Sequence, residues 1–87
     1  MKYYKLNKGF IAQKLDGKAT IFDGETSMLY TFNETASLVL QKLKLGKSKE
    51  EIVTSFVKKY GITEERAKKD VSELLQDLLS KKIISHI

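Results

Sequence analysis

The sequence predicts an α+β domain in which a three-stranded antiparallel sheet is followed by three helices. In the first third of the chain apolar and polar residues alternate with a period of two, and in the rest apolar residues recur every three or four positions. Turn and cap residues separate these segments. With 87 residues and no stretch rich in proline, glycine or serine, residues 1–87 are expected to form a single domain.

Three strands are predicted, over residues 9–15, 18–23 and 27–32. They are separated by Asp16-Gly17 and Asp23-Gly24, and Asp-Gly favours a type I′ hairpin turn because both central residues need a positive φ. Consecutive strands joined by short turns form a meander, so the first and third strands are expected to be its edges.

Three helices are predicted over about residues 34–44, 49–60 and 64–81, and an apolar tail at 83–87 could add a strand. Each helix has a polar residue that can accept hydrogen bonds from its first turn, and the first two are followed by glycine. The second also has a capping box, Ser48 with Glu51. The N-cap residues are Asn33, Ser48 and Thr63, and the terminating glycines are Gly46 and Gly61.

The composition argues against an enzyme. The chain has no cysteine and a single histidine, His86, so it lacks the residues for a disulfide scaffold, an iron–sulfur cluster, a thiolate zinc site or an obvious Ser-His-Asp triad. We expect no cofactor and no metal. No signal peptide and no apolar run of about 18 residues occur, so the protein is predicted to be cytoplasmic and not bound to a membrane.

The net charge of +5 leaves nucleic acid open as a partner without requiring it. Arg66 is the only arginine among 16 basic residues, and lysine is the weaker choice for bidentate contacts to bases and phosphates.

The third predicted strand is a candidate binding edge. Met28, Tyr30 and Phe32 share one face, and if these larger residues pack on the helices, Leu29 faces outward. An exposed edge of this kind can pair with an added peptide strand, although a purely structural edge fits the same pattern.

The third helix carries an apolar stripe that extends to one side. Its centre contains Ala67 and Val71, and the stripe widens through Leu75 and Leu79 on the flank shared with Lys68 and Ser72. This flank could form one wall of a groove, or it could simply cover the C-terminal tail or the first helix.

Three motifs in order, together with the predicted hairpin at Asp16-Gly17, resemble the PqqD-like family, also called the RiPP precursor peptide recognition element. The motifs are similar to Tyr-x-Leu-Asn-x-Thr-Ala, Gly-x-Ser/Thr-x-x-Glu-Ile and Asp-Val-x-x-Leu-Leu-x-x-Leu of that family. Two residues depart from its pattern: Phe32 stands where leucine is usual, and Lys82 where glycine often occurs. The matching segments are Tyr30 to Ala36, Leu45 to Ile52 and Asp70 to Leu78.

The resemblance implies a winged helix-turn-helix-like domain that acts as a peptide chaperone in natural product biosynthesis. Such a domain binds the leader of a ribosomally synthesised precursor peptide as an added β-strand, in the cleft between the third strand and the third helix. It presents the leader to a modifying or processing enzyme, such as a radical SAM enzyme or a leader peptidase, and makes no bond itself.

The same resemblance implies a set of peptide-binding residues. The backbone of residues 27–31 would supply the strand pairing, the apolar residues of the third helix would line the cleft, and two lysines would attract acidic leader residues. Leu75→Glu would then weaken binding while the domain stays folded. The residues are Ser27, Met28, Leu29, Tyr30, Thr31, Lys68, Lys69, Val71, Ser72, Leu75 and Leu79.

The alternative is a winged-helix DNA-binding module, because the second and third helices form a helix-turn-helix-like pair and the chain is basic. Against it, the would-be recognition helix carries acids that repel phosphates, which makes nucleic acid an unlikely partner. These acids are Glu64, Glu65, Asp70, Glu73 and Asp77.

Overall fold

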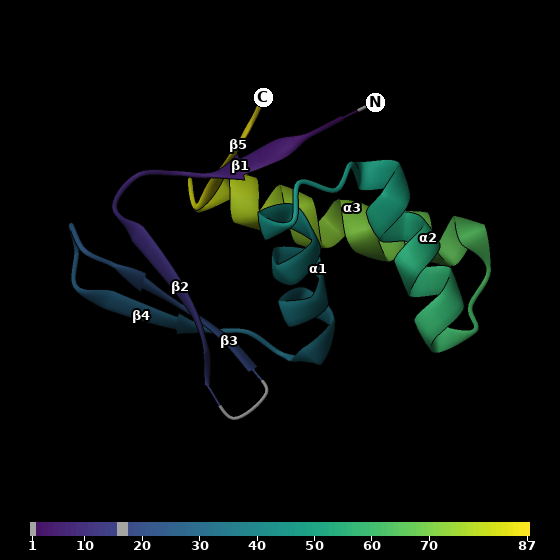
Figure 1. The fold of residues 1–87 in the computed structure, drawn as a ribbon, viewed down its shortest axis with the longest axis horizontal. Helices are drawn as coiled ribbons and strands as arrows, with labels where there is room; N and C mark the ends of the chain where they lie inside the picture. Colours follow the sequence, from purple (N-terminus) through teal and green to yellow (C-terminus); the bar gives the residue numbers. More distant parts are fainter. Residues whose placement is uncertain (1, 16–17) are drawn as a thin grey trace.

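The computed structural model describes residues 2–15 and 18–87, and it confirms the α+β class and the order of strands and helices (Figure 1). The helices agree with the predicted ranges to within one residue. The elements are β1 (Tyr4–Leu6), β2 (Phe10–Leu15), β3 (Lys18–Asp23), β4 (Met28–Thr31), α1 (Glu34–Lys44), α2 (Lys49–Tyr60), α3 (Glu64–Ser80) and β5 (Ile84–His86).

The larger sheet is the predicted antiparallel meander, with the order β2-β3-β4. Its register places Phe22 of β3 opposite Ile11 of β2 on one side and Leu29 of β4 on the other. Strands β2 and β4 are therefore the two edges. The predicted turn at Asp16-Gly17 lies outside the described residues.

The connection from β3 to β4 is a correction to the predicted type I′ turn. Four residues, 24–27, join the strands, and the positive φ occurs at Ser27 (60°) rather than at Asp23 or Gly24. Asp23 instead accepts hydrogen bonds at its carboxylate. The backbone N–H groups of Glu25 and Thr26 donate to Oδ1 at 2.9 and 3.3 Å, and the Thr26 hydroxyl donates to Oδ2 at 2.8 Å. Asparagine and aspartate stabilise turns in this way as well as by adopting a positive φ.

A second antiparallel sheet joins the two ends of the chain, so the domain has two sheets rather than the single one expected. Strand β5 confirms that the apolar tail adds a strand, and its partner β1 was not predicted. Tyr4 pairs with His86, and their rings lie 4.9 Å apart. A three-residue strand whose partner is some 80 positions away has no local pattern by which it can be recognised.

The helix ends confirm the predicted caps. Asn33 Oδ1 accepts from the Ala36 N–H at 2.9 Å, and Ser48 and Glu51 form the reciprocal capping box. Gly46 (φ 79°) and Gly61 (φ 61°) follow the first two helices in the left-handed conformation. The caps fix where each helix begins, and so fix which residues each helix directs toward the core.

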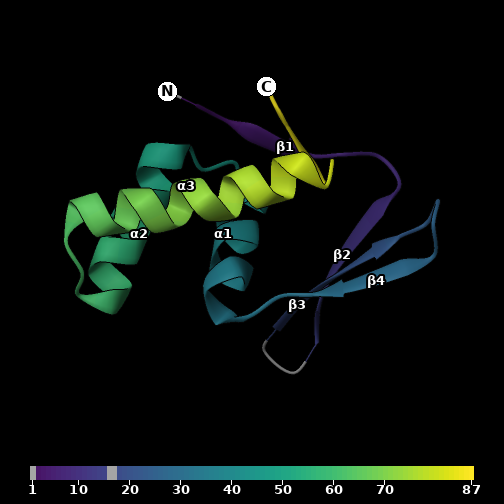
Figure 2. The same ribbon diagram turned by 180° about the vertical axis from the view of Figure 1, so that it is seen from behind.

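The core lies where α1 packs on the inner face of β3 and where α3 packs against α1, α2 and β5 (Figure 2). Its fully enclosed side chains come from the sheet, all three helices and the chain end. The largest are Phe56, Ile21, Ile52, Leu75, Leu78, Ile83, Ile84, Val39 and Val71.

Candidate functional site

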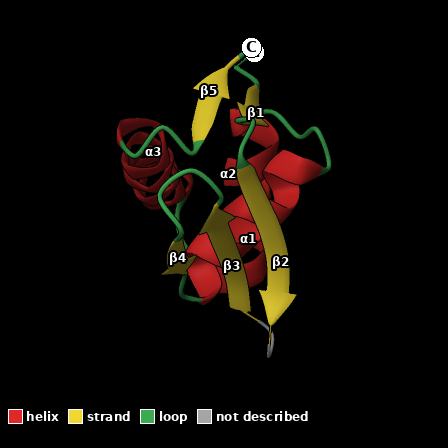
Figure 3. Ribbon diagram, turned by 90° about the vertical axis from the view of Figure 1, so that its left-hand side faces the viewer, coloured by secondary structure: helices red, strands yellow, loops and turns green. Residues whose placement is uncertain are grey.

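Strand β4 presents an open edge on the same side of the molecule as α3. Figure 3 shows α3 and β4 on the left of the view and β2 on the right. Within the part of the chain that the structure describes, β4 pairs only with β3, so its other edge is unpaired. Unpaired N–H and C=O groups along an edge can form a ladder with an added strand.

The Ser37 side chain of α1 and the backbone of Phe32 hold this edge in place. The Ser37 hydroxyl accepts from the Ala19 N–H at 2.8 Å and donates to the Phe32 carbonyl at 3.3 Å, while the Phe32 N–H donates to the Ala19 carbonyl at 3.0 Å. The first turn of α1 is therefore tied to both β3 and the residue that follows β4. The edge is a fixed feature of the fold rather than a loose terminus.

The faces of β4 agree with the prediction for Leu29 but not for Met28. Tyr30 and Phe32 pack against the core, and Leu29 faces outward with 63% of its surface exposed. Met28 was expected to pack with Tyr30 and Phe32, but it is 53% exposed. It lies at the start of the strand, opposite Asp23, where no helix covers the sheet, and its sulfur accepts a weak hydrogen bond from the Tyr30 hydroxyl at 3.9 Å.

Two predicted cleft residues of α3 are core residues instead. Val71 is 0% and Leu75 2% exposed, so neither offers a surface to a peptide. The buried residues of α3 are Ala67, Val71, Leu75 and Leu78, and the stripe is centred near Val71 because α1, α2 and β5 all contact this helix. The apolar stripe of α3 is wide because three elements cover it, and it does not form the wall of a groove.

The flank of α3 that meets the beginning of α1 carries carboxylates. A hollow of about 370 Å³ lies between Thr35 of α1, Phe56 of α2 and four residues of α3. Leu74 supplies apolar surface, Phe56 is 1% exposed, and the other three α3 residues are acidic. The α3 residues are Asp70, Glu73, Leu74 and Asp77.

Two of these carboxylates already have cationic partners. Arg66 Nε lies 3.9 Å from Asp70 Oδ2, and Lys81 Nζ lies 2.6 Å from Asp77 Oδ1. Both pairs join residues four positions apart on the exposed surface of the helix, where ion pairs are weak. Glu73 forms no ion pair with any residue that the structure describes.

The predicted lysine flank lies on the other side of the helix. At 100° per residue, Lys68, Ser72 and Leu79 are about 160° around α3 from the residues that line the hollow. Lys68 and Lys69 are exposed, while Ser72 and Leu79 are half-buried. Their contact with a peptide stays a prediction, and the position of the hollow favours the acidic flank. The sequence contained a signal for this, since Asp70, Glu73 and Asp77 recur at helical spacing.

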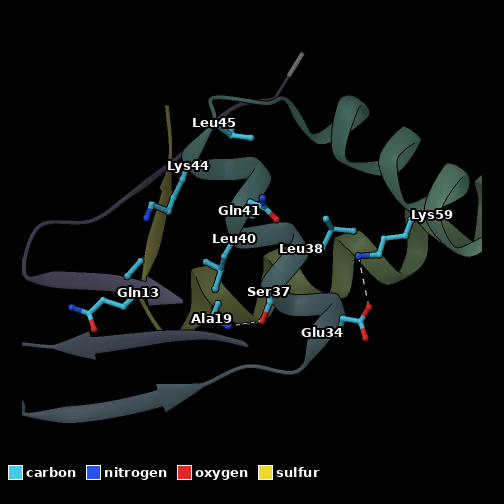
Figure 4. Close-up of a pocket in the computed structure, with 11 residues that line it drawn as sticks. Gln13, Ala19, Glu34, Ser37, Leu38, Leu40, Gln41, Lys44, Leu45 and Lys59 are labelled. Carbon is cyan, nitrogen blue, oxygen red and sulfur yellow. Dashed lines mark hydrogen bonds and ion pairs between the residues drawn. The ribbon is translucent and has the colours of Figure 1, made fainter. Parts of the chain in front are cut away.

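A second hollow, of about 320 Å³, lies on the β2 side of α1 (Figure 4). Ala12 and Ala19 leave room on the inner face of the sheet, and α1 covers it with residues that include Leu38 and Leu40. Two lysines, Lys44 and Lys59, lie at its rim. Figure 4 shows Lys59 reaching from α2 toward Glu34, with Nζ 3.7 Å from the carboxylate.

The described residues contain no group of three or more histidine, cysteine, aspartate or glutamate side chains arranged to hold a metal ion. The carboxylates of α3 therefore line a wall rather than converge on one point. No helix in residues 2–15 and 18–87 is long and apolar enough to cross a membrane.

Two solved structures share this fold. One is described as TbiB1 in complex with the TbiA(beta) leader peptide, with a TM-score of 0.87, 20% identity, and coverage of 93% of this chain and 94% of that one. The other is lasso peptide synthetase B1 complexed with the leader peptide, with a TM-score of 0.87, 21% identity, and coverage of 94% and 96%.

No curated protein sequence matches the chain. The family described as Coenzyme PQQ synthesis protein D (PqqD) matches residues 18–84, a segment that begins with β3 and ends at the first residue of β5. That match includes β4, all three helices and both walls of the candidate site. The chain belongs to the PqqD family.

Proposed function

We propose that this domain binds the leader segment of a ribosomally synthesised precursor peptide as a strand added to β4, and presents it to a modifying or processing enzyme. The observation that carries the proposal is the unpaired edge of β4, which lies on the α3 side of the sheet and carries the exposed side chains of Met28 and Leu29. Membership of the PqqD family supports it, as do the two solved structures of the same fold, each described as a leader-peptide complex.

In this proposal the backbone of residues 27–31 supplies the hydrogen bonds and side chains supply the selectivity. A ladder with β4 fixes the direction and register of the peptide, because alternate N–H and C=O groups repeat along the edge. Leu29 then lies beside one peptide residue on the outer face, at the spacing of about 5 Å that lets side chains in neighbouring strands interact.

The domain makes no bond in this proposal, and its contribution to the reaction is proximity. A bound leader raises the local concentration of the attached core peptide around an enzyme that docks on the same domain. The partner is a modifying enzyme such as a radical SAM enzyme or a leader peptidase. The three-stranded sheet and the three helices support a winged-helix-like arrangement whose sheet edge, rather than its last helix, engages the ligand.

The charge distribution does not favour DNA. A recognition helix enters the major groove and approaches phosphates, whereas one flank of α3 carries Asp70, Glu73 and Asp77. A leader peptide has no comparable density of negative charge along its backbone.

The test is a titration of the isotopically labelled full chain with the leader half of the precursor-like peptide encoded beside its gene, followed by amide chemical shifts. We expect saturable shifts centred on residues 27–31. A second series uses peptides with a single N-methylated backbone amide, which cannot donate to β4. Affinity should fall at every second position only, because alternate N–H groups of a strand face the neighbour.

Shifts that avoid residues 27–31, or N-methylation effects without a period of two, would overturn the proposal. An absence of shifts at about 1 mM peptide would place binding weaker than about −4 kcal/mol and would also count against it. Binding of duplex DNA that weakens steeply with salt and depends on base sequence would favour the DNA module instead.

A further inference from the structure

The lining of the hollow beside α3 has a charge opposite to that of the whole chain. The protein has 16 basic and 11 acidic residues and a net charge of +5. The six residues that line this hollow include three carboxylates and no cation. A ligand that approaches this wall therefore meets a local potential that the net charge does not reveal.

The hollow lies where a strand paired with β4 would continue. Strand β4 ends at Thr31, and the chain then turns away into α1, whose Thr35 forms one wall of the hollow. Figure 2 shows β4 pointing toward the start of α1, below α3, so a peptide that extends straight past Thr31 would run beside the first turn of α1 and reach the space between Thr35 and α3. The free edge of β4 is thus an independent indication that the occupant is an extended peptide.

The dimensions match a short stretch of such a peptide. From Asp70 to Asp77 the helix rises about 10 Å, at 1.5 Å per residue. An extended chain covers that length in about three residues, at about 3.3 Å each. The wall is therefore long enough for about three peptide residues, whose alternate side chains point toward it and away from it.

The surface of the hollow offers two kinds of contact. Leu74 is half-buried and supplies apolar surface beside the carboxylates of α3, whereas Phe56 is 1% exposed and belongs to the core. Asp70 and Asp77 are each engaged by a cation of α3, whereas Glu73 pairs with none of the described residues. Glu73 is therefore the carboxylate most available to a cation of the ligand.

From this arrangement we infer that the peptide bound at β4 is basic where it passes α3, with a lysine or arginine paired to Glu73 and an apolar side chain on Leu74. The inference rests on the proposed function and names the chemistry of its ligand. It replaces the expectation, based on Lys68 and Lys69, that the leader is acidic in this region. It also selects one of the two sheet edges, because the hollow beside β2 has lysines at its rim.

The test uses a displayed library of random 16-residue peptides, selected on the full chain and read by sequencing. We expect selected peptides to be enriched about tenfold in lysine or arginine at one position relative to an apolar residue. Selection on Glu73→Lys should abolish that enrichment. Selection on Glu65→Lys, which changes the net charge equally but lies outside the hollow and about 12 Å before Glu73 along α3, should keep it.

Binding measurements with one selected peptide give the contribution of Glu73 to its affinity. Glu73→Gln should weaken its binding about two- to fivefold, the range expected for a single exposed ion pair. The loss should shrink as sodium chloride is raised, because salt screens the pair. Replacement of the basic peptide residue by glutamine should have the same effect in the wild type and no further effect in Glu73→Gln.

The outcomes separate the inference from the proposed function. Peptides that shift residues 27–31 but carry no preferred cation would overturn the inference and leave strand addition intact. Enrichment of aspartate or glutamate would overturn it in favour of the lysine flank. If no peptide is selected, or if selected peptides leave residues 27–31 unshifted, the proposed function fails first and the inference with it.

Discussion

The two edges of the β2-β3-β4 sheet lie beside hollows of opposite charge. Next to β2, the hollow under α1 is lined by Lys44, Lys59 and Glu34, two cations and one carboxylate. Next to β4, the hollow under α3 is lined by Asp70, Glu73 and Asp77. The side chains on the outer face are otherwise well matched, since Ile11 of β2 and Leu29 of β4 both lie opposite Phe22 and are exposed.

This difference indicates what decides which edge takes a peptide. The backbone of either edge can pair with an added strand, because N–H and C=O groups are the same in both. Discrimination must therefore come from side chains that a passing peptide meets after it leaves the strand. In this domain those side chains differ in sign, so a charge on the peptide favours one edge and disfavours the other.

The largest effect, a loss of stability, is expected from Leu75→Glu, which disrupts the core on which both hollows depend. Because Leu75 is 2% exposed, the substitution buries a carboxylate without a partner, at a cost of several kcal/mol. Small domains have only about 5–15 kcal/mol of stability, so we expect loss of the folded state in circular dichroism. This is opposite to the result expected if Leu75 lined an open cleft.

The matched control for that variant is Leu45→Glu, since Leu45 follows α1 and is exposed. It makes the same chemical change at the surface and should unfold at nearly the wild-type temperature. If Leu75→Glu keeps a wild-type spectrum and loses only peptide affinity, Leu75 belongs to the binding site after all.

A second pair of variants compares the edges directly. Leu29→Gln should weaken peptide binding about three- to tenfold, because it removes apolar contact beside an added strand, whereas Ile11→Gln should change affinity less than twofold. Both residues are exposed and lie opposite the same Phe22, so their effects on stability should be alike. Equal losses of affinity, measured by calorimetry, would mean that both edges take part.

Most of the fold could be predicted from the sequence because its elements carry local signals. The caps Asn33, Ser48 and Thr63 marked the helix starts, and the period of the apolar residues distinguished strands from helices. The pairing of β1 with β5 carried no such signal, since it depends on two short segments from opposite ends of the chain.

The outward position of Leu29 on β4 was predicted correctly, and the burial along α3 was predicted less well. Alternation along β4 was enough to place Leu29 outward, because a strand has only two faces. A helix has no such restriction, and which flank of α3 meets α1 depends on packing that the sequence of α3 alone does not specify. The carboxylates Asp70, Glu73 and Asp77 were noticed as a reason against DNA, but their place beside Thr35 required the structure.

A smaller and stabilising effect is expected at Lys82, which joins α3 to β5 with a φ of 60°. A left-handed conformation costs an ordinary residue about 1–2 kcal/mol and glycine almost nothing, although glycine loses more entropy on folding. Lys82→Gly should therefore stabilise the domain by about 0.5–1 kcal/mol and raise Tm by roughly 3–6 °C in calorimetry. Lys81→Gly, one residue earlier at a helical φ of −79°, should lower it. A lower Tm for Lys82→Gly would show that the lysine side chain is needed there.

The smallest effect is expected on Tm at low pH, and it comes from Asp23 in the turn that leads into β4. The hydrogen bond from the Thr26 hydroxyl, followed by that from the Glu25 N–H, lowers the pKa of the Asp23 carboxyl below its ordinary value. A lowered folded-state pKa contributes stability that is present above the unfolded-state value of about 3.9 and is lost as the pH falls through the folded-state value. Between about pH 5 and 2 the Tm of the wild type should therefore fall more than the Tm of Asp23→Asn. Thr26→Ala removes the hydroxyl that contributes most to the lowered pKa of Asp23, so its Tm should fall by an intermediate amount. Parallel curves for all three would mean that Asp23 does not stabilise the turn through its charge, and the position of β4 would then depend on its pairing with β3 and on the contacts of Ser37 alone.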